Sequence, residues 1–464
     1  MAFPPSLRKF NRNSFAVMMS SEDHLLQQQK EALTRLYKWF QPESETKQQI
    51  ALVSMPTGSG KTGVMACLPY FLGSIGLNKS LPEPSGVPLY PFDKPVLVIA
   101  PDKTISKQLE EQLSVSQSGS IDEAFLIRRG IVPVANKDVL PKAKRIESTA
   151  ELKDRHPLET NELIIANAQK FLVNNWEDEL PADMFRLVIV DEAHHHPART
   201  WRRIVEKFQR QAQVVFFTAT PYRGDGQQVL ENQNMVYHLS LADAVAAGII
   251  RKTNFLPELK EIDTLQGIDV SRNVAEDKSD IGRMVTILRK VKALLLFKNE
   301  NVAHQLPDGE QHMAMAIAGN TIQADLLLEL WRNIYPDDEA ESYHSNLKQW
   351  QKKQIMEKLK NNELRLVIVV GMLLEGFDHP PISIAAITYK ITSPVKFAQF
   401  VGRAQRIYRG THEIEKNGEA HIITHADHEQ RQLYDSLIEE RLIPADPLTT
   451  SDNFVPVTTT SNDQ

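Results

Sequence analysis

The sequence predicts an α/β fold in which helices flank parallel sheets, spread over two successive domains. The first observation is a set of short runs of aliphatic and β-branched residues, separated by segments with helical patterns. Such continuous apolar runs indicate strands that are buried on both faces of a parallel sheet. The second observation is the length, because 464 residues exceed the size of one ordinary domain. The third is that segments carrying Gly, Thr, Asp or Glu directly follow four of the runs.

Seven apolar runs are expected to be strands, at residues 50–53, 96–100, 163–166, 187–190, 214–217, 366–370 and 382–387. The segments PTGSGKT, DEAHHH, TATPYRGDG and GMLLEGFD follow the first, fourth, fifth and sixth of these runs. Ligands of open α/β sheets bind outside the carboxyl ends of the strands. The four segments therefore predict one shared site.

We expect five parts along the chain. Residues 1–21 form an N-terminal extension, 22–250 the first domain, 251–282 a linker, 283–445 the second domain and 446–464 a disordered tail. The linker is polar and weakly periodic, and the tail has few large apolar residues to bury.

The composition is that of a soluble globular protein with a large core, with 42% hydrophobic and 24% charged residues. The net charge of -6 means that any contact with nucleic acid must use a local groove. The single cysteine, Cys67, excludes an internal disulfide and is expected to be a buried thiol in a reducing compartment. No apolar run reaches the ~20 residues of a membrane helix, and we expect a cytoplasmic protein.

The segment MPTGSGKT at 55–62 has the composition of a phosphate-binding loop. Its glycines allow backbone N–H groups to face a phosphate, and the following helix adds its positive N-terminus. Lys61 is expected to reach the β- and γ-phosphates of a nucleotide, and Thr62 to offer a hydroxyl to Mg²⁺. The strict pattern has glycine where this chain has Met55. The other residues expected to bind the nucleotide here are Thr57, Gly58, Ser59 and Gly60.

Two carboxylates end the strand at 187–190. Phosphoryl transfer to water needs a metal that bridges phosphate oxygens and a group that orients the water. Asp191 is the expected Mg²⁺ ligand and Glu192 the expected general base, although a pair of acids can also cap a helix. His194 is expected to sense the γ-phosphate and to link the site to the TAT segment at 218–220.

A second-domain helix is expected at 397–408. At ~100° per residue, Gln399, Arg403 and Arg406 fall on one face of this helix. An ordinary amphipathic helix has the same pattern, but a full α/β unit separates this one from the phosphate loop. Arginines from a second domain can stabilise charge on a transferring phosphoryl group. We therefore expect Arg403 and Arg406 to act across a cleft.

Gln29 lies on the apolar stripe of a helix expected at 26–40, whereas Gln27 and Gln28 fall off it. An amide in this position can contact adenine, because adenine offers both a donor and an acceptor. It can equally be a glutamine at the edge of a buried face. The residues alone leave both readings open.

Taken together, these motifs resemble the superfamily 2 helicases, and within them the restriction-type (type III restriction subunit R-like) branch. The resemblance covers residues 22 to about 425 in the motifs LLQQQKEAL, MPTGSGKT, VLVIAPDKTISKQL, VIVDEAHH, FFTATPYRGDG, GMLLEGFDHP and QFVGRAQR. It implies two tandem RecA-like domains with ATP and Mg²⁺ in the cleft between them. It also implies that Gln29 reads adenine and that Thr218 and Thr220 couple hydrolysis to strand movement.

The same resemblance places Glu375, Gly376 and Asp378 near the ribose and the nucleic acid. The chain departs from the family at Gly371, where many relatives have threonine, and in reading APD rather than APT at 100–102. The implied function is ATP hydrolysis coupled to translocation on DNA or its unwinding, as a motor of a restriction, defence or repair system. No nuclease pattern is visible, so cleavage would need another chain. The alternatives are an RNA helicase and an ATP-gated switch without translocation.

Overall fold

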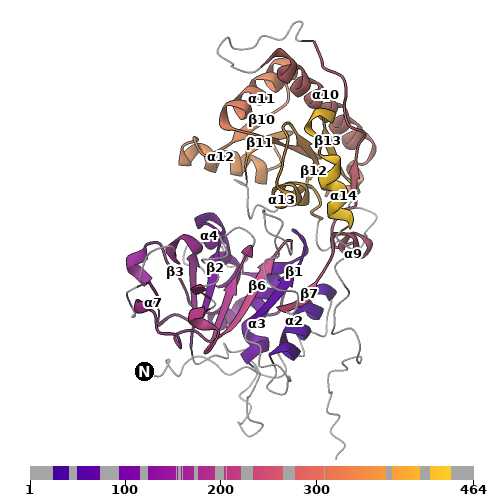
Figure 1. Cartoon of the computed structure of the whole chain (residues 1–464). Helices are drawn as coiled ribbons and strands as arrows, with labels where there is room; N and C mark the ends of the chain where they lie inside the picture. The colour runs from indigo at the N-terminus through magenta and orange to yellow at the C-terminus, as the bar shows by residue number, and fades with distance from the viewer. Residues whose placement is uncertain are drawn as a thin grey trace, which may run out of the picture.

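The computed structural model has two lobes, each built around a parallel sheet (Figure 1). The structure describes residues 24–40, 50–73, 94–114, 124–152, 154, 158, 160–171, 176–193, 203–204, 206–220, 234–264, 277–307, 309–371, 379–407 and 418–439.

The sheet of the first lobe has seven parallel strands in the order β3-β4-β2-β5-β6-β1-β7. Their bounds are β1 Ile50–Ser54, β2 Val96–Ala100, β3 Ala143–Arg145, β4 Leu163–Asn167, β5 Leu187–Val190, β6 Gln213–Thr218 and β7 Met235–His238. The central strands are buried on both faces, as their continuous apolar sequences require.

Helices pack on both faces of this sheet and form two separate cores. The four helices that contribute to the core on the face next to the phosphate loop are α2 Gln27–Trp39, α3 Lys61–Gly73, α4 Lys103–Leu113 and α5 Phe125–Arg128. The remaining short elements are α7 Trp176–Glu179 and the 3₁₀ turns η2 Val134–Val139, η3 Thr149–Leu152 and η4 Ala168–Phe171. The loop between β1 and α3 therefore sits at the carboxyl edge of the sheet.

The second lobe has six parallel strands in the order β10-β11-β9-β12-β13-β8. Their bounds are β8 Thr253–Phe255, β9 Met313–Ala318, β10 Ala340–Tyr343, β11 Leu366–Val370, β12 Ile382–Ile387 and β13 Ala420–Thr424. The helical elements are α9 Leu241–Ala246, α10 Lys278–Asn301, η7 Ala303–Gln305, α11 Thr321–Ile334, α12 Gln349–Lys360, α13 Pro394–Ala404, η9 Ala426–His428 and α14 Arg431–Glu439. Helices α10 and α11 cover one face of this sheet, and α12, α13 and α14 cover the other.

All seven expected strands are present, three of them one or two residues longer than expected. The α/β class and the parallel sheets are therefore confirmed. Strand β9, which lies in the middle of the second sheet, was not expected. Its sequence MAMAIA contains a single β-branched residue, so it lacks the composition that marks a strand.

The range expected as a linker, 251–282, contains parts of the second lobe. Strand β8 pairs with β13, and α10 begins at Lys278. Strand β8 forms one edge of the sheet. Its residues Thr253 and Phe255 are buried, and Phe255 belongs to the same core as the apolar residues of α13. The expected N-terminal extension and C-terminal tail lie outside the described residues.

Cys67 is fully buried in the core around α3, as expected, and this burial raises the pKa of its thiol. Among the described helices, none combines the length and the apolar character that a membrane span needs.

Candidate functional site

The loop between β1 and α3 is shaped by two glycines in the left-handed region. Gly58 has a φ of 84° and Gly60 a φ of 102°, values that other residues rarely adopt. The loop is closed by Ser59, whose Oγ donates a 2.7 Å hydrogen bond to the carbonyl oxygen of Pro56. Helix α3 begins at Lys61, so its N-terminus faces the loop. A loop of this shape at a helix N-terminus is an anion-binding site.

Met55 stands where the strict loop pattern has glycine, and the structure accommodates it in the core. Its side chain is fully buried, and its backbone N–H donates a 3.0 Å hydrogen bond to the Thr218 carbonyl oxygen. The side chain thus points away from the loop, which explains why this position does not need glycine.

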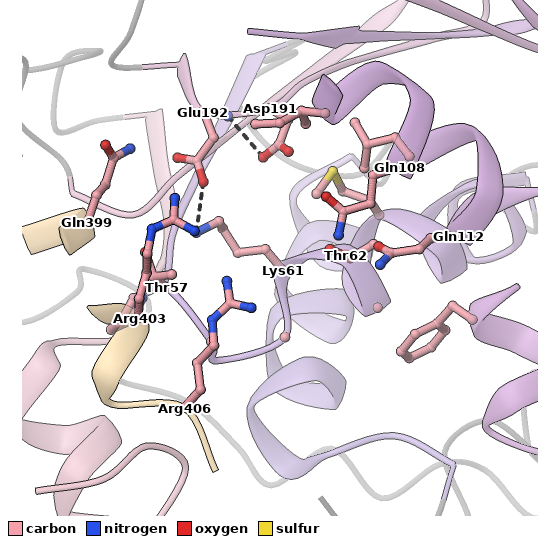
Figure 2. A pocket seen from close by; sticks show the side chains of 18 of the residues that line it. Thr57, Lys61, Thr62, Gln108, Gln112, Asp191, Glu192, Gln399, Arg403 and Arg406 are labelled. Carbon is pink, nitrogen blue, oxygen red and sulfur yellow. Dashed lines mark hydrogen bonds and ion pairs between the residues drawn. The ribbon is translucent and has the colours of Figure 1, made fainter. Parts of the chain in front are cut away.

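Lys61 lies at the centre of the site and is 8% exposed. Its Nζ donates a hydrogen bond to the Met55 carbonyl oxygen at 3.2 Å and lies 3.5 Å from Oε1 of Glu192. The ammonium group is therefore held at the boundary between the loop and the acidic end of β5 (Figure 2).

The two carboxylates follow β5 directly, as expected. The Asp191 N–H donates to the Ile99 carbonyl oxygen at 2.9 Å, and the Glu192 N–H donates to Oδ1 of Asp191 at 2.9 Å. Glu192 has a φ of 47°, in the left-handed region. Non-glycine residues in this region cost of order 1 kcal/mol, and such strain is concentrated at functional sites.

Burial and the negative charge of Glu192 raise the pKa of Asp191 to about 7, while the charge of Lys61 opposes this shift. A buried carboxylate of this kind gains much from a cation, because the cation favours its ionised form. The oxygens of Asp191 and the hydroxyl of Thr62 line the same pocket and are the ligand type that Mg²⁺ prefers. These residues therefore fit a magnesium ion.

Helix α13 brings second-lobe side chains to the phosphate loop. Ser393 caps its N-terminus and Pro394 opens it, but the helix ends at Ala404 rather than at residue 408. Arg403 therefore lies on the helix and Arg406 beyond its end, so the expected single helical face is wrong for Arg406. Gln399, Arg403 and Arg406 nevertheless line one pocket together with Lys61 (Figure 2).

The two lobes approach closely at this point. A methyl group added at Gly402 would lie 3.0 Å from Cβ of Thr57, and one added at Gly58 would lie 3.3 Å from Cγ of Arg406. Glycine at both positions allows α13 and its end to lie against the phosphate loop.

Arg251 fixes the end of α13. Its backbone N–H donates to the Gln405 carbonyl oxygen at 2.7 Å, and its Nη1 donates to the carbonyl oxygens of Pro380 at 2.8 Å and Ile382 at 3.1 Å. The side chain is 2% exposed, and burial lowers its pKa to about 10, which leaves it charged at neutral pH. The neighbouring Ile250 side chain lies beside Gly58.

Gln29 is fully buried and lies behind the phosphate loop. Its Nε2 donates to the Gly60 carbonyl oxygen at 2.9 Å, and its Oε1 accepts from the Leu26 N–H at 2.9 Å. Gln28, expected to lie off the buried stripe, is only 5% exposed and donates to the Ser59 carbonyl oxygen at 3.0 Å. The helical wheel missed Gln28 because a hydrogen bond to the loop, rather than apolar packing, accounts for its burial.

The pocket has a second wall that the sequence did not indicate. Beyond Thr62 it is lined by Ile105, Gln108, Leu109 and Gln112 of α4 and by Phe125 and Arg128 of α5. The α4 side chains are spaced as i, i+3, i+4 and i+7, which places them on one helix face. This spacing was the one sequence signal that could have indicated the wall. It is not specific, because any helix that packs against a core shows the same spacing.

Thr218 and Thr220 were expected to couple hydrolysis to strand movement. Thr218 is the last residue of β6, and Thr220 lies two residues beyond it. Oγ1 of Thr218 donates to the Thr220 carbonyl oxygen at 2.6 Å. Neither lines the pocket, and Thr218 reaches the phosphate loop through Met55. The expected residues His194, Glu375, Gly376 and Asp378 lie outside the described residues.

Residues 22–223 match the family model described as "Type III restriction enzyme, res subunit". The matched residues include the phosphate loop, Asp191 and Glu192 of the first lobe. Over 58% of its length, the chain is 24% identical to a protein of Methanocaldococcus jannaschii described as "Putative type I restriction enzyme MjaIXP endonuclease subunit", of which the match covers 29%. The chain spans between 29% and 53% of the length of the curated relatives it matches.

Solved structures share the fold of both lobes. The type ISP restriction-modification enzyme LlaBIII bound to DNA matches 86% of this chain and 27% of its own, with a TM-score of 0.56 and 16% identity. The Dbp5 protein of S. cerevisiae bound to RNA matches 93% of this chain and 91% of its own, with a TM-score of 0.54 and 11% identity. At these identities the likeness establishes the fold of two tandem RecA-like domains.

Proposed function

We propose that this protein hydrolyses ATP between its two lobes and uses the cycle to move along DNA or to unwind it. The observation that carries the proposal is that Arg403 and Arg406, from the second lobe, line the same pocket as Lys61 and Glu192 of the first. Cations that meet a phosphate loop from another domain make hydrolysis depend on how the domains are arranged. Residues 22–250 and 283–445 are the proposed domains, with β8 and the start of α10 assigned to the second.

The phosphate loop binds the nucleotide through the backbone of Thr57, Gly58, Ser59 and Gly60 and through Lys61. Thr62 and Asp191 are the residues that would hold Mg²⁺, which neutralises charge on the phosphate oxygens. Lys61 moves from Glu192 to the β- and γ-phosphates, because phosphate oxygens are stronger partners for its ammonium group than a single carboxylate oxygen.

Glu192, released from Lys61, acts as the general base. It accepts a proton from a water molecule whose oxygen attacks the γ-phosphorus, and the bond from that phosphorus to the β–γ bridging oxygen breaks. The products are ADP and inorganic phosphate. Arg403 and Arg406 stabilise the negative charge that spreads over the γ-phosphoryl oxygens, and Gln399 lines the same side of the site.

Movement follows from the connections around the loop. Thr218 and Thr220 are joined to the loop through Met55, and Arg251 holds the end of α13. Loss of the γ-phosphate removes the anion that both lobes bind, so the lobes are free to separate. His194, Gly376 and Asp378 are further residues that we propose for nucleotide binding and coupling, on the family motifs in the sequence.

DNA is the proposed track, because the matched family and one solved relative are restriction enzymes. A separate nuclease or another defence or repair subunit is the proposed partner, and the cytoplasm the proposed location. The net charge of -6 suits contact with nucleic acid through the interlobe groove rather than the whole surface.

The test is ATP hydrolysis by the purified chain with Mg²⁺ and, separately, duplex DNA, single-stranded DNA and structured RNA. We expect DNA to stimulate hydrolysis and the Lys61→Ala variant to be inactive with every nucleic acid. Stimulation by RNA alone would establish an RNA helicase instead. Hydrolysis that is indifferent to all three would indicate an ATP-gated switch.

A further inference from the structure

Gln405 lies between Arg403 and Arg406 in the chain, but it is not among the residues that line the pocket. It directly follows the last residue of α13 and is 2% exposed. Its Nε2 donates a hydrogen bond to Oγ1 of Thr253, and its carbonyl oxygen accepts one from the Arg251 N–H. The backbone and the side chain of Gln405 are therefore both bound to the segment that leads from the first lobe into the second.

Thr253 also contacts α14, the helix that packs beside α13 (Figure 1). Its carbonyl oxygen accepts a 2.9 Å hydrogen bond from the hydroxyl of Tyr434. Burial raises the pKa of Tyr434, so this hydroxyl stays protonated and able to donate at neutral pH. Thr253 is 9% exposed and lies opposite Ala420 of β13. The sheet thus fixes Thr253, and side chains that follow α13 and belong to α14 both bind to it.

Side-chain packing strengthens the attachment of α14 to β8. The ring centroids of Phe255 and Tyr434 are 5.0 Å apart, and aromatic pairs of this kind favour a fixed geometry. The Arg431 guanidinium lies 5.2 Å from the centroid of the Phe255 ring and 5.9 Å from that of the Tyr434 ring, where the rings attract its charge. Helix α14 therefore holds β8 through an aromatic pair and a cation as well as through the hydrogen bond to Thr253.

The position of Arg406 depends on how Gln405 is held, because Arg406 lies beyond the last helical residue of α13. Its side chain passes close to the phosphate loop, since a methyl group added at Gly58 would lie 3.3 Å from Cγ of Arg406. A shift of about 1 Å in a group that must meet the transition state can cost roughly 10²-fold in rate. The residue directly before Arg406 is therefore well placed to control the rate of hydrolysis.

We propose that Gln405 is a positioning residue for Arg406, and that α14 holds it in place through Tyr434 and Thr253. We name Gln405, Thr253 and Tyr434 the Gln405 relay. A displacement of α14 against β8 changes the rate of hydrolysis through this relay and leaves the residues that bind the nucleotide unchanged. Helix α14 is then the place at which a contact on the second lobe regulates turnover. This inference rests on the proposed function, because it concerns the position of Arg406 in the same reaction.

The test is single-turnover hydrolysis of saturating ATP, with Mg²⁺ and the stimulating nucleic acid, together with equilibrium binding of ATP. Thr253→Val removes the hydroxyl that accepts from Gln405 and keeps the shape of the side chain. Its hydrolysis rate should fall about tenfold, with ATP affinity within about twofold of the wild type. Thr253→Ser keeps the hydroxyl, and its rate should stay within about twofold of the wild type. Gln405→Ala should behave like Thr253→Val.

Tyr434→Phe tests the far end of the relay, because it removes the hydroxyl and leaves the ring beside Phe255. Its hydrolysis rate should fall about threefold with unchanged ATP affinity. Tyr343→Phe is the matched control and should hydrolyse ATP like the wild type, since Tyr343 lies on β10, at the opposite edge of the sheet from β8. If buried Gln405→Ala does not fold, the Thr253 and Tyr434 variants decide the test.

Double variants show whether the relay acts through Arg406. Adding Thr253→Val to Arg406→Ala should lower the already slow rate by no more than about twofold, because the positioned group is gone. A further tenfold loss would overturn the inference, since the relay would then act on another group. Wild-type rates in Thr253→Val and Tyr434→Phe would also overturn it, and a slow Arg406→Ala would then leave the proposed function standing. A wild-type rate in Arg406→Ala would defeat the proposed function itself.

Discussion

The backbone N–H of Arg251 donates a 2.7 Å hydrogen bond to the carbonyl oxygen of Gln405. Arg251 lies in the segment that enters the second lobe. Gln405 directly follows Ala404, the last residue of α13, and directly precedes Arg406. The Arg251 guanidinium adds donors to the carbonyl oxygens of Pro380 and Ile382. A cation near a helix C-terminus is favourable, so Arg251 stabilises the position from which Arg406 extends.

Replacing Arg251 by methionine should therefore lower both stability and turnover. The buried carbonyl oxygens lose a charged donor, which should cost about 3 kcal/mol of unfolding free energy in urea titrations. Because Arg406 loses its fixed position, kcat should fall at least about tenfold while KM for ATP changes little. Arg251→Lys, which keeps the charge, should recover part of both. A methionine variant that is less stable but has normal kcat would limit Arg251 to a structural role.

Gly402 tests the contact between the lobes. In Gly402→Val the added side chain meets Thr57, where even a single methyl group would lie at 3.0 Å, so α13 must move away from the phosphate loop. We expect kcat to fall about tenfold or more with ATP affinity within about threefold of the wild type. Gly402→Ala should show a smaller loss in the same direction. Equal, full activity in both variants would contradict the close approach.

Variants of Lys61 and Glu192 should separate the effect on ATP binding from the effect on the rate of hydrolysis. Lys61→Ala should weaken ATP binding at least about tenfold, because a charged contact to the phosphates is lost. Glu192→Gln should bind ATP as tightly as the wild type or more tightly, since its 3.5 Å ion pair with Lys61 no longer competes with phosphate. Its turnover should fall roughly 10²- to 10⁴-fold. Binding by calorimetry and steady-state hydrolysis measure the two effects, and normal turnover in Glu192→Gln would exclude it as the base.

His312 should make the second lobe sensitive to acid. Burial, together with the nearby charge of Lys298, lowers the pKa of His312 to about 3, and its ring contacts the Ser383 hydroxyl at 2.9 Å. The folded chain keeps the ring neutral, whereas the unfolded chain takes up a proton below its ordinary pKa of about 6.5. The stability contribution is therefore complete above about pH 6.5 and is lost as the pH falls toward 3.

Between pH 7 and pH 5 this single group should cost about 2 kcal/mol of unfolding free energy. In His312→Asn the loss over the same interval should be smaller by about that amount, as measured by urea unfolding at the two pH values. An unchanged pH dependence would mean that His312 is charged or exposed in the folded chain.

Much of this architecture follows from local sequence. The strands around β5 are continuous apolar runs, and the loop at 55–62 and the acids Asp191 and Glu192 follow strands directly, so chain order alone places them at one sheet edge. Arg403 could be predicted from another local pattern, because it lies on the polar face of a helix. Strand β9 was missed since alanine and methionine have no strong preference for strands.

The remaining features depend on contacts between distant segments. Gln28 and Gln29 are engaged by backbone groups of the phosphate loop, which no helical wheel can indicate. The part of the pocket lined by α4 and α5 forms only because these two helices pack against α3. In the sequence Arg251 is one of two adjacent basic residues, and its role becomes visible only in the structure, where the carbonyl oxygens of Pro380, Ile382 and Gln405 accept its hydrogen bonds.

The central claim is that side chains from the second lobe act on phosphates held by the first. Single-turnover hydrolysis of saturating ATP by Arg406→Ala, in the presence of the stimulating nucleic acid, tests it most directly. We predict ATP affinity within about threefold of the wild type and a hydrolysis rate lower by roughly 10³-fold. A wild-type rate in this variant would contradict the account.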